Sequence, residues 1–229
     1  MPVPLAGYVE VPLTSDLYPE LSPNEEAILP LLIDAAQEME AIFWREAYGD
    51  PEPLLASIAD PEQRRLVEIN CGPWDRADGN VPFIDGVDPK RPGAEFYPAD
   101  ITREEFEAAC QSSPDHGAAL KSPYTLVRRD AHGELFAVPY HEAFSGHVGR
   151  AAEKLGEAAE LSEDPGLRRY LELRAAALLD DKYRGSDLAW LDMHDNGIDI
   201  IIGPVEQYED MLFGYKAAHE GVVLLKDRV

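Results

Sequence analysis

Apolar residues recur at helical spacing near the start of the chain, after an opening stretch without periodicity. Residues 1–21 contain several prolines and no sustained repeat, so we expect an extended arm there. Ser22 and Glu25 form a capping box, which predicts a helix that runs to about Tyr48. Pro30 lies inside this apolar pattern and should kink the helix or delay its start.

The middle of the chain has a different pattern. Residues 70–100 interleave glycine, proline, aspartate and aromatic side chains without a period, and loops of this length are usually functional or packed on their own aromatics. Thr102 begins another capping box and a helix. Strands are then predicted over residues 124–128 and 134–140, joined by a hairpin turn at residues 130–133.

Three further helices are predicted before the last strands. They are predicted to begin near Glu142, at Asp164 and at Ser186, which we expect to be the cap of the third helix. Strands follow over residues 198–202 and 221–226, with a helical turn between them.

This order of elements predicts an α+β fold, with helices packed beside a small, mostly antiparallel sheet or partial β-barrel. A chain of 229 residues can bury a substantial core. We expect the extended arm over residues 1–21 and a single α+β lobe over residues 22–229.

Charge narrows the classes of partner. Lysine and arginine total 20 against 44 aspartates and glutamates, which gives a formal net charge of −24. This charge repels phosphate backbones and anionic lipid, so we expect no nucleic-acid and no membrane partner. A cationic partner fits better, such as a short peptide with a free amino terminus, although acidity that only maintains solubility explains the charge equally well.

The expected location is the cytoplasm. The first residues show no secretory signal, and no apolar run approaches the roughly 20 residues that span a bilayer. The sequence has two cysteines, Cys71 and Cys110. So few cysteines are typical of free thiols in a reducing compartment, and a single disulfide between them is the alternative. We predict a soluble, acidic, cytoplasmic protein.

The strongest candidate for a metal-binding motif consists of His141, Glu142 and His147. A zinc-binding helix normally carries its histidines four residues apart on one face. Here the separation is six, about 240° of rotation at 3.6 residues per turn, which points the imidazoles apart. We therefore predict surface histidines at the start of a helix and no metal site. Residues 150–156 only faintly echo the Nudix signature, and no nucleophile motif is complete, so we assign no catalytic residue.

Two polar and aromatic clusters remain as candidate binding segments. The first spans residues 70–80 and includes Trp74, and the second spans residues 203–210, directly after a predicted strand. Carboxylates, amides and aromatics at a strand end suit recognition of a peptide backbone and amino terminus. The alternative is that each loop is held by its own capping hydrogen bonds, with Trp74 and Tyr208 as packing residues.

The same segments resemble the dipeptidyl-peptidase III family, in particular its shorter bacterial members. The pattern GP-x-E-x-Y-x-D, followed by FG and then EG, is fairly specific, and the likeness covers nearly all of residues 22–227. It is carried by three stretches, FWREAYGDPEPLLASIADPEQRRLVEINCGPWDRADGNVPFIDG, GAEFYPADITREEFEAA and SDLAWLDMHDNGIDIIIGPVEQYEDMLFGYKAAHEGVVLLKD.

The resemblance implies a two-lobed zinc peptidase that removes dipeptides from the free amino end of short peptides. This chain would supply most of the β-containing lobe, with the segment 203–210 facing the cleft. Asp199 would lie near the substrate's amino group, although Ile201 stands where the family usually has an aromatic residue. The other candidate peptide contacts are Asn70, Trp74, Glu206, Tyr208 and Asp210.

The resemblance also implies zinc held by a helix with two histidines five residues apart and by a glutamate from a later helix. Neither occurs in this sequence, so we expect no cofactor in this chain and a substrate-side lobe that is inactive alone. Its partner would be the missing zinc-binding lobe, and the chain would be a truncated form. Two alternatives stay open: a non-catalytic peptide- or protein-binding module, and an accessory portion of a Nudix fusion protein.

Overall fold

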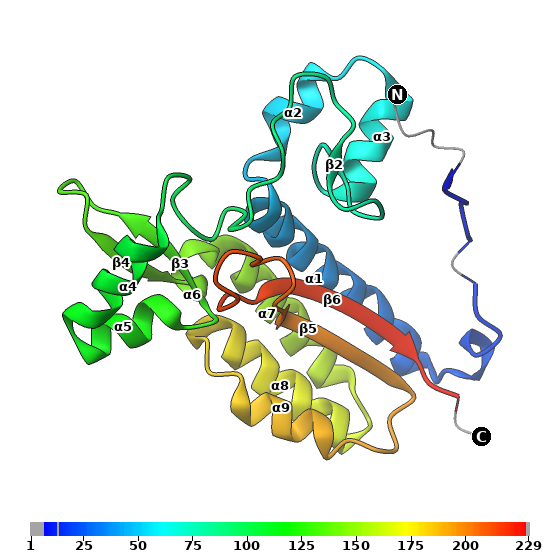
Figure 1. Cartoon of the computed structure of the whole chain (residues 1–229). Helices are drawn as coiled ribbons and strands as arrows, with labels where there is room; N and C mark the ends of the chain where they lie inside the picture. Colours follow the sequence, from blue (N-terminus) through cyan, green and yellow to red (C-terminus); the bar gives the residue numbers. More distant parts are fainter. Residues whose placement is uncertain (1–6, 13, 228–229) are drawn as a thin grey trace. The chain divides into compact units, whose positions relative to one another are not determined.

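The computed structural model describes residues 7–12 and 14–227 of this chain (Figure 1). These residues divide into two compact units, each drawn from three separate segments of the sequence. Unit 1 contains residues 7–12, 43–137 and 207–216, and unit 2 contains residues 14–42, 138–206 and 217–227. The predicted division into an arm and a single lobe stays a prediction, and residues 1–6, 13 and 228–229 lie outside the described part.

The predicted first helix is confirmed as α1 (Pro23–Ala47). Its capping box forms as expected: Ser22 Oγ accepts from the Glu25 backbone N–H at 3.2 Å, and the Glu25 carboxylate accepts from the Ser22 N–H at 2.9 Å. The predicted delay at Pro30 was wrong, because the helix already begins at Pro23 and continues through Pro30. Proline removes one N–H donor, and the remaining turns of this long helix tolerate that loss.

Unit 2 combines the short 3-10 helix η2 (Tyr18–Glu20) and most of α1 with four further α-helices. These are α6 (Tyr140–Ala143), α7 (Ser145–Leu161), α8 (Pro165–Asp180) and α9 (Arg184–Leu191). The helix predicted from Glu142 is therefore interrupted at Phe144. The cap predicted at Ser186 was wrong, since α9 already begins at Arg184 and the Ser186 hydroxyl donates to the Tyr183 carbonyl at 2.8 Å.

A two-stranded antiparallel ribbon completes unit 2. It pairs β5 (Ile198–Glu206) with β6 (Ala218–Leu225), and a bulge lies between Pro204 and Glu206. Both strands are longer than predicted. The helical turn expected between them is absent, because residues 207–217 form only turns and irregular backbone.

Unit 1 contains shorter helices and two small sheets. The helices are α2 (Pro51–Ser57), α3 (Pro61–Asn70), α4 (Arg103–Ser112) and α5 (Pro114–Lys121). The strands are β1 (Trp74–Asp75), β2 (Val81–Pro82), β3 (Thr125–Arg129) and β4 (Leu135–Pro139), of which β4 ends within unit 2. Within the described residues all strands pair two by two, so helices beside small sheets confirm the predicted α+β class.

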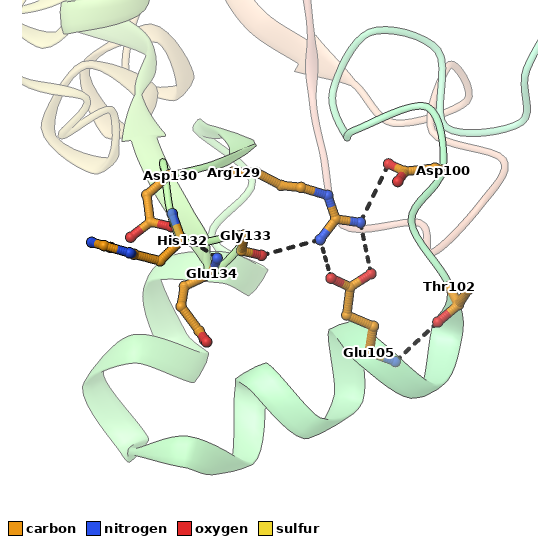
Figure 2. Close-up of polar contacts among 8 residues, drawn as sticks. All are labelled: Asp100, Thr102, Glu105, Arg129, Asp130, His132, Gly133 and Glu134. Atoms are coloured by element: carbon orange, nitrogen blue, oxygen red, sulfur yellow. Dashed lines mark hydrogen bonds and ion pairs between the residues drawn. The ribbon is translucent and has the colours of Figure 1, made fainter.

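The predicted hairpin at residues 130–133 is confirmed and is tied to α4 by one guanidinium (Figure 2). Arg129, at the end of β3, forms a two-pronged ion pair with Glu105 and contacts Asp100 at 3.3 Å. These hydrogen bonds from Arg129 hold the pKa of Glu105 below its usual value. Gly133 closes the turn with a φ of +87°, a conformation that favours glycine.

A close approach between β6 and α1 gives a stability prediction for unit 2. A methyl group on Gly221 would lie 2.7 Å from both Cα and Cβ of Ala36, so Gly221→Ala should lower the free energy of unfolding by about 1–3 kcal/mol. Gly149→Ala is the matched control, because a methyl group there meets nothing within 4 Å and helix α7 should gain about 0.5–1 kcal/mol. Urea unfolding of both variants measures the difference, and effects of equal sign would contradict the close packing.

None of the helices in the described part of the chain combines the length and the apolar run that a bilayer crossing needs.

Candidate functional site

The first predicted binding segment and residues 207–210 of the second lie in unit 1, where they contribute to a pocket of about 580 Å³. The first segment supplies the turn between β1 and β2, and the second supplies the irregular stretch that follows β5. A third stretch, residues 89–92, comes from the long aromatic loop. The residues that line the pocket are Arg76, Gly79, Asn80, Pro89, Lys90, Arg91, Pro92, Tyr208, Glu209 and Met211.

Glu209 is the charged centre of this pocket. Its side chain is only 2% exposed, and it lies 2.9 Å from Arg76 Nη1 and within hydrogen-bond distance of Lys90 Nζ. Burial raises the pKa of the Glu209 carboxyl, but the hydrogen bonds and charges of Arg76 and Lys90 outweigh burial and leave it below the ordinary value. Sequence reasoning did not select Glu209 or Lys90, because pairs 133 and 119 residues apart leave no local pattern.

Asn70 holds Arg76 in place. Its side chain is buried, donates to the Leu66 carbonyl at 2.9 Å and accepts from the Arg76 backbone N–H at 3.0 Å. The guanidinium Nε of Arg76 donates to the Asn70 carbonyl at 2.8 Å, and the group stacks over the Phe43 ring at 4.7 Å. Asn70 therefore positions a pocket residue, and its predicted contact with a peptide stays a prediction.

Trp74 has a similar anchoring geometry. Its indole N–H donates to the Asp88 carbonyl at 2.8 Å, and its ring lies 5.7 Å from that of Tyr48. These contacts fix the loop against the end of α1 within unit 1. They match the packing alternative for this residue, and a direct peptide contact is still untested.

Asp210 and Tyr208 differ sharply in environment although they are two residues apart. Tyr208 lines the pocket and is 59% exposed, so its ring can meet a ligand. Asp210 is 3% exposed, and its carboxylate accepts from the Tyr97 hydroxyl at 2.6 Å. It also accepts from four backbone N–H groups, those of Leu212, Phe213, Tyr215 and Lys216. Asp210 therefore organises the loop that carries Tyr208.

The remaining two candidates belong to unit 2. Asp199, on β5, accepts from the Trp190 indole N–H at 2.9 Å, and Glu206 is exposed at the end of the same strand. The six predicted contact residues thus fall into two sets, four in unit 1 and two in unit 2.

The two histidines of the candidate metal-binding motif lie on separate helices and have separate partners. His141 Nδ1 is 2.7 Å from Asp181 Oδ2, and His147 Nδ1 is 2.7 Å from Glu38 Oε2. Across residues 7–12 and 14–227, no group of three or more histidine, cysteine, aspartate or glutamate side chains converges to hold a metal ion. Cys71 and Cys110 are both free thiols.

The chain is similar in fold and sequence to solved structures. The chain superposes on the structure of dipeptidyl-peptidase III from Caldithrix abyssi with a TM-score of 0.87 and 41% sequence identity over 92% of its length. It superposes on dipeptidyl-peptidase III from Corallococcus sp. strain EGB with a TM-score of 0.90 and 37% identity over 97% of its length. This chain is dipeptidyl-peptidase III-like. The resemblance to dipeptidyl-peptidase III that the sequence indicated is thereby confirmed.

The likeness covers less than half of each of the two solved chains. This dipeptidyl-peptidase III-like chain spans 41% and 42% of the lengths of those two chains. No family model matches the sequence. Among curated proteins, Nudix hydrolase 3 of Arabidopsis thaliana is 28% identical over an alignment of 279 residues, which covers 97% of this chain and 36% of the plant protein.

Proposed function

We propose that this chain is the substrate-side part of a dipeptidyl-peptidase III-like zinc peptidase, one that binds short peptides and leaves zinc binding to another part of the enzyme. The observation that carries the proposal is the likeness in fold and sequence, at 37–41% identity over nearly the whole chain. The expected partners are peptides with a free amino terminus and a zinc-carrying lobe, and the expected place of action is the cytoplasm.

Each unit, taken by itself, offers groups that support a binding role. Tyr208 offers an exposed ring at the pocket of unit 1. Asp199 and Glu206, in unit 2, offer carboxylates that suit a peptide's ammonium group. In a peptidase of this type zinc would polarise the scissile carbonyl and activate water. The residues of this chain would hold and orient the peptide for that step.

Two assays of the purified chain test the proposal. Isothermal titration calorimetry with tetraalanine should show binding, and acetylation of the peptide's amino terminus should weaken it. A chromogenic dipeptidyl amide should not be hydrolysed by the chain alone, with or without added zinc. Hydrolysis should appear when the chain is co-expressed with the part of the Corallococcus protein that lies outside the matched region. Absence of peptide binding would sink the proposal.

Tyr208→Ala should weaken tetraalanine binding about tenfold, because an exposed aromatic ring at a pocket gives large contact area at low entropic cost. Since the side chain is 59% exposed, the melting temperature should barely change. Tyr18→Ala is the matched control, a tyrosine 45% exposed in the other unit. Equal affinities for the two variants would remove Tyr208 from the peptide site.

An accessory role in a Nudix protein is the second candidate. It is supported by the alignment of 97% of this chain to part of a protein named Nudix hydrolase 3. If the chain has this role, it should change the rate of a Nudix hydrolase encoded in the same gene region. It should also bind no tetraalanine. A peptide-binding module without chemistry differs again, because it predicts binding and no gain of hydrolysis on co-expression.

A further inference from the structure

We propose that the pocket of unit 1 binds the carboxylate at the C-terminus of the bound peptide, with the Lys90 ammonium and the Arg76 guanidinium as its ligands. This inference rests on the proposed function, because it assumes that a peptide is the ligand.

The first support is the state of the Lys90 ammonium. Its side chain is only 10% exposed and lines the pocket, yet among the described residues only Glu209 accepts a hydrogen bond from it. An ammonium has three N–H donors, so two are left without a protein acceptor. A nearly buried cation with open donors is costly unless an acceptor reaches it.

The second support is the local charge. Arg76 and Lys90 together face a single carboxylate, that of Glu209, which is the only acidic side chain among the described residues lining the pocket. Arg91 also lines the pocket, and its partner Glu95 does not. The pocket therefore has an excess of positive charge in a chain whose net charge is −24.

The third support is the match between these donors and a carboxylate. Arg76 uses three of its five N–H donors, one on the Asn70 carbonyl and two on Glu209, with the longer of the latter at 3.4 Å. An ionised carboxylate only accepts hydrogen bonds and has two oxygens, so it can take donors from Arg76 and Lys90 together. The exposed Tyr208 ring, which also lines this pocket, would cover the apolar part of the terminal residue.

The test compares tetraalanine with its C-terminal amide, both with a free amino terminus, by isothermal titration calorimetry at low salt. The acid should bind about tenfold more tightly than the amide, because the difference is one charge-assisted set of hydrogen bonds. Added salt should reduce the preference, since part of it is screened. If the acid and the amide bind equally, the carboxylate pocket is wrong while the proposed function stands. If neither binds, both fail.

Two variants test the role of Lys90, and a third is the control. Lys90→Gln should reduce the preference for the acid to about twofold or less, and Lys90→Arg should retain most of it. Lys182→Gln removes the same charge from an exposed site in the other unit and should leave the preference unchanged. The comparison on the unmodified chain decides the matter even where Lys90→Gln folds poorly. A tenfold preference that survives in folded Lys90→Gln would overturn the assignment.

A third peptide separates the two sources of carboxylate. Tetraalanine amide with its last residue replaced by glutamate has a side-chain carboxylate and no terminal one. It should bind like the glutamine-containing amide. A strong preference for the glutamate peptide would show that the pocket reads an acidic side chain, which contradicts the assignment to the C-terminus.

Discussion

Asp210→Ala is expected to lower the free energy of unfolding by about 3–5 kcal/mol, among the largest effects that a single substitution in unit 1 can have. The carboxylate is buried and accepts from the Tyr97 hydroxyl and four backbone N–H groups. Alanine would leave five buried or half-buried donors without this acceptor, and each fully buried orphaned donor costs on the order of 1 kcal/mol or more.

The loop that carries Tyr208 should loosen in the same variant, so peptide affinity should fall together with stability. Urea unfolding monitored by tryptophan fluorescence measures the stability change. Asp85→Ala is the control, an exposed aspartate of the same unit that should change the stability by less than about 0.5 kcal/mol. The loss of unfolding free energy in Asp210→Asn should lie between the losses in Asp210→Ala and Asp85→Ala. Asparagine keeps one acceptor oxygen but turns its NH₂ group toward other donors. Equal effects at positions 210 and 85 would contradict the assigned role of Asp210.

Local signals predicted several of the helix starts. Asp164 precedes a proline and caps a helix, accepting from the Leu167 N–H at 2.7 Å. The same signal stands at Asp50 before Pro51 and at Ser113 before Pro114, where the helices were missed. Those two helices are short, so the apolar period that would have drawn attention to them is weak.

The pocket could not be predicted in the same way. The segments 70–80 and 203–210 were each selected as candidate binding segments, but nothing in the sequence indicated that Arg76 and Glu209 meet. Their pairing depends on tertiary structure over more than a hundred residues. Within the selected segments, polarity alone did not separate an organising carboxylate such as Asp210 from a pocket-facing residue such as Tyr208.

The buried charge of Lys216 is a further feature that no local pattern indicated. Its side chain is fully buried in unit 1, and its ammonium donates to the carbonyls of Leu120 at 2.6 Å and Ser122 at 2.9 Å and to Thr125 Oγ1 at 2.8 Å. Burial lowers the pKa of Lys216 to about 7, although the nearby charges of Asp210 and Cys110 favour the protonated form.

The stability of unit 1 should therefore rise with pH above neutrality. The folded-state pKa of Lys216 is about 7 and its ordinary value is 10.5. Between these values the unfolded chain holds a proton that the folded chain has released, so the free energy of unfolding gains up to about 1.4 kcal/mol per pH unit. Below pH 7 both states hold the proton, and this contribution no longer changes with pH.

Lys216→Met removes the titrating group while it keeps the length of the buried side chain. Between pH 6 and pH 9, the stability of the unmodified chain should rise by about 2–3 kcal/mol relative to this variant, as measured by urea unfolding at each pH. Comparing the two chains at each pH cancels the titration of groups that they share. Lys121→Met, an exposed lysine of the same unit, should show no such relative change. If the unmodified chain and Lys216→Met follow parallel stability curves, Lys216 stays protonated in the folded state throughout this range, and its three acceptors outweigh the cost of burying the charge.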